Sequence, residues 1–321
     1  MNRILAVGIV CLSFAACTAE SPTRTPVTVM LDWVPNTNHT GIFVAQSQGF
    51  FEDAGLEVEI VQPGEVFAEQ AVAGGAADFG ISFQEQVTLA RADEVPLVSI
   101  AAIIQNNTSG FASLAAGSPA EWEGLRYGSF GSLFEEPTLR GLMECEGADY
   151  ETLEVVDTGF SDPLALLEQE QIDLAWIFNG WQGVQAELQG IHLEIVMMED
   201  WFDCIPDYYT PVIVTAESTL EERPEIVRGF LEAVSRGYRF AIDDPTSAAD
   251  ILLDAAPELD EQLVKMSLQW LAPRYQADAA RWGQQELDVW NAYSQWMADR
   301  DILAVAIHAE RAFTNEYLPR E

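Results

Sequence analysis

The sequence predicts an α/β protein made of two successive strand–helix units and a helical C-terminal region. Strand-like apolar segments alternate with helix-like segments between residues 26 and 215, and this alternation is typical of mostly parallel sheets. A chain of 321 residues has room for two domains. Its hydrophobic content of 49% is sufficient for the cores of both.

The first unit begins with residues 26–31 (PVTVML), which are almost continuously apolar, as buried parallel strands are. Gly49 and Gly55 each end a short helical pattern. The remaining patterns predict strands at 57–61, 79–82 and 97–104, and helices at 41–49, 50–56, 67–75 and 85–92.

The second unit has the same alternation, and Pro163 marks the start of one of its helices. Strands are predicted at 125–129, 153–156, 174–177, 192–197 and 211–215, with helices from 137 onward, at 162–170 and at 182–189. From Pro224 the chain is mainly helical. Helical spacing predicts core packing for four tryptophans of this region, Trp270, Trp282, Trp290 and Trp296.

The N-terminus has the pattern of an export signal. Arg3 precedes an apolar run of about thirteen residues, which is shorter than the roughly 20 that span a bilayer. Ala15 and Ala16 directly before Cys17 resemble a lipobox, with Phe14 in place of the usual leucine. We therefore expect a signal peptide over 1–16, lipidation at Cys17, a tether over 17–25, and an extracytoplasmic, membrane-anchored protein. An ordinary cleaved signal is the alternative.

The cysteines agree with export. Cys11 falls in the signal, which leaves Cys145 and Cys204 as an even pair. These two side chains can form a disulfide in an exported chain or remain separate buried thiols. No Cys-x-x-Cys motif or histidine cluster indicates a metal site.

The charge is strongly negative, with 52 acidic against 15 basic residues and a net charge of −37. Lys265 is the only lysine. Such a surface repels nucleic acids and anionic lipid headgroups, so neither is an expected partner. The acidic residues are spread along the chain, which favours a solvated acidic surface over an acidic tail.

In open α/β sheets, ligands bind outside the carboxyl ends of the strands. The loops at those predicted ends are polar or aromatic. They offer ring faces for stacking, and amides or carboxylates for in-plane hydrogen bonds, as a planar heteroaromatic ligand needs. These loops are residues 32–39, 82–85, 105–110, 127–132, 179–181 and 207–210.

Six segments resemble, in order, blocks of the ThiY-type solute-binding proteins, and together they extend over nearly the whole mature chain. That family delivers a formylated aminopyrimidine, a thiamine precursor, to an ABC transporter. The segments are LDWVPNTNHTGIFVA (31–45), GISFQE (80–85), NTSGFAS (107–113), WIFNGWQG (176–183), DYYTPVIVT (207–215) and WLAPRYQADAARWG (270–283).

The resemblance implies a two-lobed periplasmic-binding-protein type II fold with a hinge between the lobes. It places lobe one at 26–111 and 211–321 and lobe two at 112–210, with crossings near Ser109–Gly110 and Tyr209–Pro211. It also implies a monomer that closes around its ligand and is recognised by an ABC permease. Some relatives take riboflavin or other aromatics, so a different aromatic ligand is the alternative.

The ligand-binding residues expected from these loops fall into three chemical kinds. Trp33 and Trp181 are candidates for stacking on the ligand ring. Asp32, Glu85 and Asp207 are candidate acceptors for an exocyclic amine or a protonated ring nitrogen. Each residue has a purely structural alternative in packing or loop ordering. The polar set is completed by Asn38, His39, Gln84 and Tyr208.

An enzyme is the third hypothesis, because fungal thiamine-pyrimidine synthases resemble the same family. Those enzymes form a Schiff base between pyridoxal phosphate and a lysine just upstream of the position of His39, and carry a cysteine-rich iron motif. Here Lys265 is far along the chain and no cysteine cluster exists. We therefore expect no catalytic residue, cofactor or metal.

A glycine-containing loop, Gly128–Ser132, precedes a helix and could hold a phosphate on its backbone amides. Glu135 and Glu136 follow it, and the nearest cation is Arg140. We interpret the loop as a wall for an uncharged or cationic ligand.

The acidic composition generates the hypothesis that the protein works in high salt, where screening reduces self-repulsion. We expect the unfolding midpoint to be higher in molar salt than in dilute buffer. Equal midpoints in the two solutions contradict the hypothesis.

Overall fold

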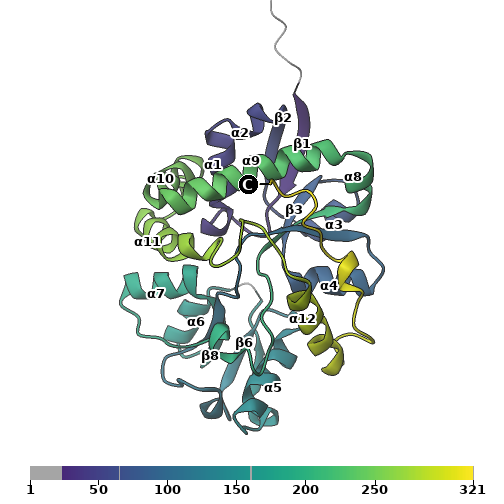
Figure 1. The fold of residues 1–321 in the computed structure, drawn as a ribbon. Coiled ribbons are helices and arrows are strands. Elements are labelled where there is room, and N and C mark those ends of the chain that lie inside the picture. Colours follow the sequence, from purple (N-terminus) through teal and green to yellow (C-terminus); the bar gives the residue numbers. More distant parts are fainter. Residues whose placement is uncertain (1–23, 65, 160, 321) are drawn as a thin grey trace, which may run out of the picture.

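The computed structural model describes residues 24–64, 66–159 and 161–320. The expected signal peptide, Cys17 and most of the tether lie outside these residues. Within them, no helix has the length and apolarity to span a membrane. Figure 1 shows two lobes, each with its own sheet, one above the other.

The sheet of the upper lobe has the strand order β2-β1-β3-β10-β4. Strands β1 to β4 run in one direction and β10 in the other, because β10 pairs antiparallel with both β3 and β4. The strands are β1 (Thr25–Met30), β2 (Leu56–Val61), β3 (Phe79–Ser82), β4 (Leu97–Ala102) and β10 (Val212–Ala216).

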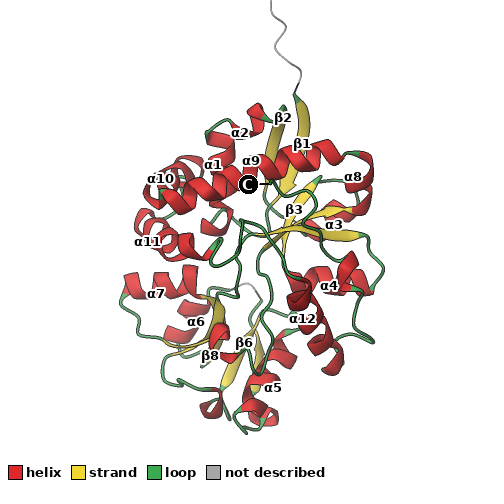
Figure 2. Ribbon diagram, viewed as in Figure 1, coloured by secondary structure: helices red, strands yellow, loops and turns green. Residues whose placement is uncertain are grey.

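The lower sheet repeats this arrangement in the order β7-β6-β8-β5-β9, with β5 as the reversed strand (Figure 2). This confirms the predicted α/β, two-lobed type II fold, with each mostly parallel sheet containing one reversed strand. The strands are β5 (Ser109–Ser113), β6 (Arg126–Ser129), β7 (Glu154–Asp157), β8 (Leu174–Phe178) and β9 (Glu194–Met197).

Strand β5 was not predicted, because its short sequence SGFAS contains a glycine and has little β-branched character. The glycine is required by packing. A Cβ at Gly110 would lie 2.6 Å from the carbonyl oxygen of Val196 on β9, so only glycine fits between the strands.

Helices pack on both faces of the upper sheet. On one face, Val29 and Phe79 pack against Phe230 of α9 and Ile42 of α1. The helices of this lobe are α1 (Thr40–Ser47), α2 (Phe50–Asp53), α3 (Ala68–Ala73), α4 (Gln84–Ala92), α8 (Glu217–Glu222), α9 (Pro224–Asp243), α10 (Pro245–Ala255) and α11 (Glu261–Leu271).

The lower sheet is covered by α5 (Glu135–Cys145) on the face of Phe111 and Trp176, and by α6 (Pro163–Glu168) on the face of Ile177. The predicted helix at 182–189 begins as a π-helical turn, η4 (Asn179–Gly183), and continues as α7 (Val184–Gln189).

One helix of the C-terminal region, α12 (Leu287–Asp299), joins the two cores. Its Trp290 packs with Val212 and Val214 of the upper sheet. Its Tyr293, Trp296 and Met297 pack into the core of the lower lobe, beside which α12 lies in Figure 1. Since the predicted limits assign α12 to lobe one, this helix links lobe one to lobe two.

The register of the reversed strands decides which loops meet. Val212, at the start of β10, pairs with Ser82 and Ala102, the last residues of β3 and β4. Ser109, at the start of β5, pairs with Phe178, the last residue of β8. Both reversed strands begin where the chain has just passed between the sheets. The carboxyl ends of the parallel strands of both sheets therefore meet at the inter-lobe connections.

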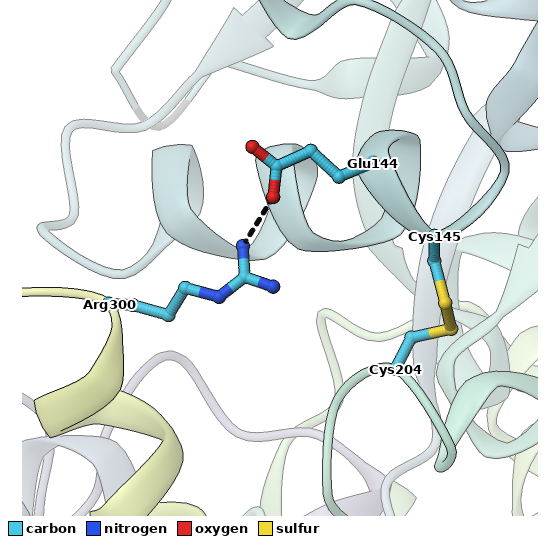
Figure 3. Close-up of a disulfide and its surroundings, with 4 residues drawn as sticks. All are labelled: Glu144, Cys145, Cys204 and Arg300. Carbon is cyan, nitrogen blue, oxygen red and sulfur yellow. Dashed lines mark hydrogen bonds and ion pairs between the residues drawn. A yellow bond between two sulfur atoms is a disulfide. The ribbon is translucent and has the colours of Figure 1, made fainter.

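A disulfide joins Cys145 and Cys204, with a Cα–Cα distance of 6.1 Å, which selects the bonded form of the two open alternatives. It links the end of α5 to the segment that leads back to lobe one. Figure 3 shows it beside the ion pair of Arg300, just after α12, with Glu144, 3.1 Å apart. Lobe two, its return connection and α12 are thus held together at one place.

We expect the double substitution Cys145→Ser and Cys204→Ser to lower the free energy of unfolding by about 2–4 kcal/mol, because the unfolded chain regains the freedom of a 59-residue loop. Urea unfolding measures this difference. Reductant should destabilise the wild type to a similar extent and leave the double variant unchanged. Equal midpoints for the wild type and the variant contradict the prediction.

Candidate functional site

The loop after β1 is organised around His39. Asn36 caps the short helix η1 (Thr37–His39) by accepting a hydrogen bond from the Asn38 amide, and its own amide donates to Nδ1 of His39 at 3.2 Å. Nε2 of the fully buried His39 therefore carries the proton and lies 2.5 Å from Oδ1 of Asp32. Both imidazole nitrogens are used inside the loop, which orients the Asp32 carboxylate.

The same loop exposes an aromatic ring. Trp33 is 44% exposed, and Asn38 is only partly buried, with its carbonyl oxygen accepting from the hydroxyl of Tyr238. Phe67, 51% exposed, follows the neighbouring strand β2. Because β1 and β2 run parallel in register, both loops leave the same corner of the sheet. Trp33 is thus available to a ligand at this edge.

A carboxylate that the sequence analysis missed lies nearby. Glu69 of α3 accepts a hydrogen bond from Ser82, the last residue of β3. Burial raises the pKa of Glu69, and the neighbouring Asp32 carboxylate adds to this increase. In the sequence, Glu69 looks like an ordinary surface residue of a helix, so only the packing of α3 reveals it.

The two connections between the lobes are linked by side chains of the predicted set. Oε1 of the Gln84 side chain accepts from the backbone amide of Tyr209 at 2.9 Å. The backbone amide of Gln84 donates to the backbone carbonyl of Tyr209 at 3.0 Å. Oδ1 of Asp207 accepts from the amides of Asn107 at 3.0 Å and Tyr208 at 2.9 Å. Gln84 and Asp207 therefore fix the backbone of the hinge region.

Five buried side chains gather at this hinge, and we call them the hinge cluster: Gln84, Glu85, Asn107, Tyr208 and Tyr293. The rings of Tyr208 and Tyr293 lie 4.2 Å apart, and the Tyr208 hydroxyl lies close to Glu85 and Asn107 without an aligned hydrogen bond. Tyr293 comes from α12, where its helical spacing is that of a residue packed in the hydrophobic core.

Each member of the hinge cluster has a buried polar atom without a hydrogen-bond partner among the described residues: Nε2 of Gln84, Oε2 of Glu85, Nδ2 of Asn107, and the hydroxyls of Tyr208 and Tyr293. Every such atom costs about 1–3 kcal/mol. Native proteins leave few of them, and internal contacts of the Tyr208 hydroxyl with Glu85 and Asn107 satisfy only part of this group, so the hinge cluster is a candidate place for a polar ligand.

The charge state of the cluster follows from its burial. Burial raises the pKa of Glu85 to about 8, and it raises that of Asp207 to about 6 against the opposing effect of the amides of Asn107 and Tyr208. A ligand that brings an N–H donor or a positive charge would favour the ionised form of either carboxyl.

The last predicted residue, Trp181, lies on η4 in lobe two but packs against the core of lobe one. Beside it, the carbonyl of Gly180 accepts from Ser267 of α11, whose hydroxyl also bonds to that of Thr37 at 2.6 Å. A Cβ at Gly180 would approach Leu271 to 3.0 Å. The lobes are thus in direct contact at η4, and Trp181 forms part of that contact.

Among the predicted residues, the structure brings together Gln84, Glu85, Asp207 and Tyr208 at the hinge, and Asp32 with His39 at the edge of β1. Trp33 and Trp181 lie apart from the hinge cluster, one exposed and one between the lobes. The sequence did not indicate Asn107 or Tyr293 as site residues. Asn107 lies in a polar loop, and Tyr293 is part of a helical aromatic pattern.

The raised pKa of Glu85 predicts a pH dependence of stability. The unfolded chain loses this proton near pH 4.5 and the folded protein near pH 8. The stability present below pH 4.5 is therefore lost as the pH rises toward 8, by up to about 1.4 kcal/mol per pH unit. Relative to the wild type, Glu85→Gln should become progressively more stable over this range in urea unfolding.

Asp207→Asn is the matched control for this experiment. It keeps the acceptor oxygen for both amides, and its advantage over the wild type should stop growing near pH 6. If the free energies of unfolding of Glu85→Gln and the wild type change equally with pH, the raised pKa of Glu85 is contradicted.

Sequence comparisons relate the chain to both binding proteins and synthases. It is 28% identical to a formylaminopyrimidine-binding protein of Halalkalibacterium halodurans, with 98% of each chain covered. It is 25% identical to the riboflavin-binding protein RibY of Chloroflexus aurantiacus, covering 99% of this chain and 98% of that protein. A 4-amino-5-hydroxymethyl-2-methylpyrimidine phosphate synthase of Legionella pneumophila is 24% identical, with 94% and 95% covered.

Among solved structures, the fold is similar to that of the periplasmic aliphatic sulphonate binding protein SsuA from Escherichia coli. The TM-score is 0.69 at 13% identity, with 94% of this chain and 95% of that chain covered. At this identity the likeness shows the fold alone. The profile of the NMT1/THI5-like family matches residues 36–248, about two thirds of the chain, and the protein therefore belongs to the NMT1/THI5-like family.

Proposed function

We propose that the protein is the extracytoplasmic solute-binding protein of an ABC importer and captures a thiamine precursor of the formylaminopyrimidine type. The observation that carries this proposal is the hinge cluster, in which one carboxyl, two carboxamides and two phenols each have a buried polar atom without a hydrogen-bond partner among the described residues. The relative named for binding a formylaminopyrimidine, aligned over nearly the whole chain, supports it.

Recognition would use complementary hydrogen bonds. An exocyclic amino group donates to the carboxylate of Glu85, and the amides of Gln84 and Asn107 donate to ring nitrogens or to a formyl oxygen. Asp32, held in place by His39, offers a further acceptor at the edge of lobe one. Bonds between an amine and a carboxylate gain strength when either group is charged.

The positions of Lys265 and His39 favour a carrier over a catalyst. Lys265, the only lysine, lies on the surface of α11, where Nζ pairs with Glu261 at 2.7 Å and Asp250 at 3.3 Å. No other amine side chain is available for a Schiff base. Both nitrogens of His39 hold the loop after β1. We therefore propose a binding protein without cofactor or catalytic residue.

We further propose that the protein is held at the membrane surface. A lipid on Cys17 would anchor a monomer to the membrane, and the tether up to Thr25 would let it reach the permease. The two-lobed fold supports delivery, because closure around a ligand gives the permease a surface that differs from the open form.

The proposal is tested by native mass spectrometry of the purified protein and by calorimetry with a panel of ligands. A formylaminopyrimidine should bind more tightly than riboflavin. A co-purified flavin would identify riboflavin as the ligand, in line with the RibY relative. Turnover with pyridoxal phosphate and iron would contradict the carrier.

Trp181→Ala should weaken binding of the aminopyrimidine by at least about 1 kcal/mol, because it removes part of the contact that η4 makes between the lobes when they close around the ligand. Leu188→Ala, an exposed change on the adjacent α7, is the control and should leave affinity unchanged. Calorimetry measures both. Unchanged affinity for Trp181→Ala removes this ring from the site.

A further inference from the structure

Outside the hinge, η4 at the end of the lower sheet lies directly against α11, which packs on the upper sheet. In Figure 1, α7, which continues η4, lies just below α11. π-Helical turns such as η4 occur mainly at functional sites. The contact includes no member of the hinge cluster, so it has to be explained separately.

A chain of three buried groups crosses this contact. The backbone carbonyl of Gly180 can only accept, so Ser267 of α11 donates its hydroxyl proton to it. The hydroxyl of Thr37 in turn donates to that of Ser267 at 2.6 Å. Ser267 is 0% exposed and Thr37 is 1% exposed. Separation of the lobes would break the bond to Gly180, whereas the bond between Thr37 and Ser267 lies within lobe one.

The same chain leads into the loop after β1. The carbonyl of Thr37 accepts from the hydroxyls of Tyr275 at 2.6 Å and Thr40 at 2.8 Å. His39, two residues further along η1, bonds to Asp32. The contact with η4 is therefore connected by hydrogen bonds to the loop that presents Asp32.

Gly180 is required by the close approach of the two lobes. It is not among the glycines with a positive φ, so its backbone conformation would accept alanine. A Cβ at this position would lie 3.0 Å from Leu271 and 3.0 Å from the ring of Trp270, and the three nearest atoms all belong to α11. A side chain on Gly180 is therefore opposed by the other lobe.

We propose that Gly180 and Ser267 form a reversible latch, and that these positioning residues give the closed arrangement part of the population before a ligand binds. The latch can open, because the hydroxyl and the carbonyl both find partners in water when the lobes separate. Ligand affinity rises with the populated fraction of the closed form. The statement about affinity rests on the proposed function, whereas the statement about the lobes does not.

The first test uses the ligand-free protein and small-angle X-ray scattering. Gly180→Ala should enlarge the radius of gyration relative to the wild type, because the added methyl group pushes α11 away from η4. Gly180→Val should enlarge it further. Gly229→Ala on α9 is the matched control and should leave the radius unchanged, since a Cβ there meets no atom closer than 3.5 Å.

An unchanged radius of gyration in both Gly180 variants overturns the proposal, because the contact is then permanent packing. A lower thermal unfolding midpoint without a change in radius has the same meaning. An equal enlargement in Gly229→Ala also contradicts the proposal, since the swelling is then independent of the latch.

The second test measures the Kd of an aminopyrimidine by calorimetry. Gly180→Ala and Ser267→Ala should each raise it by at least about fivefold, because overpacking or an unpaired carbonyl destabilises only the closed form. The double variant should lose little more affinity than either single variant, because both substitutions act on one contact. Gly229→Ala should bind like the wild type.

Unchanged affinity in the two single variants, or losses that multiply in the double variant, would show that Gly180 and Ser267 do not act as one latch. If the aminopyrimidine does not bind the wild type, the proposed function fails instead. The scattering experiment then still decides whether the latch exists, because it needs no ligand.

Discussion

The direction of two strands is the constraint on which the rest of the structure depends. β10 and β5 run against the other strands of their sheets, and each starts where the chain has just passed from one lobe to the other. Their antiparallel registers bring the carboxyl ends of both sheets to the same connections. Loops separated by more than 100 residues in the sequence, such as those holding Gln84 and Tyr209, can then bond to each other.

This arrangement concentrates polar groups where burial is expensive. The hinge cluster keeps two carboxamides, a carboxyl and two phenols away from water without complete hydrogen bonding among the described residues. Proteins tolerate such groups at binding sites, because a ligand that supplies the missing partners gains affinity from the same atoms. The disulfide and the Arg300–Glu144 pair, which hold lobe two, α12 and the return connection together, offset part of that cost.

Charge decides which ligand chemistry the inter-lobe face favours. Buried carboxyls accept hydrogen bonds from amines when ionised, and the backbone amides of Phe130 and Ser132 after β6 already donate to Glu135. The sequence had suggested that Glu135 and Glu136 simply repel phosphate. The structure separates their roles, because Glu136 lies on the surface with Arg140 whereas Glu135 turns inward to the amides.

The sequence by itself determined the α/β class and nearly all strands, because hydrophobic periodicity and turn residues act locally. It did not reveal β5, whose identity as a central strand depends on Gly110 fitting against β9. It also did not indicate Glu69, Asn107 and Tyr293 as site residues. It could not show that both ring nitrogens of His39 form hydrogen bonds within the loop after β1. Only the tertiary structure decided these points, because the burial and hydrogen bonding of a polar side chain depend on neighbours that are distant in the sequence.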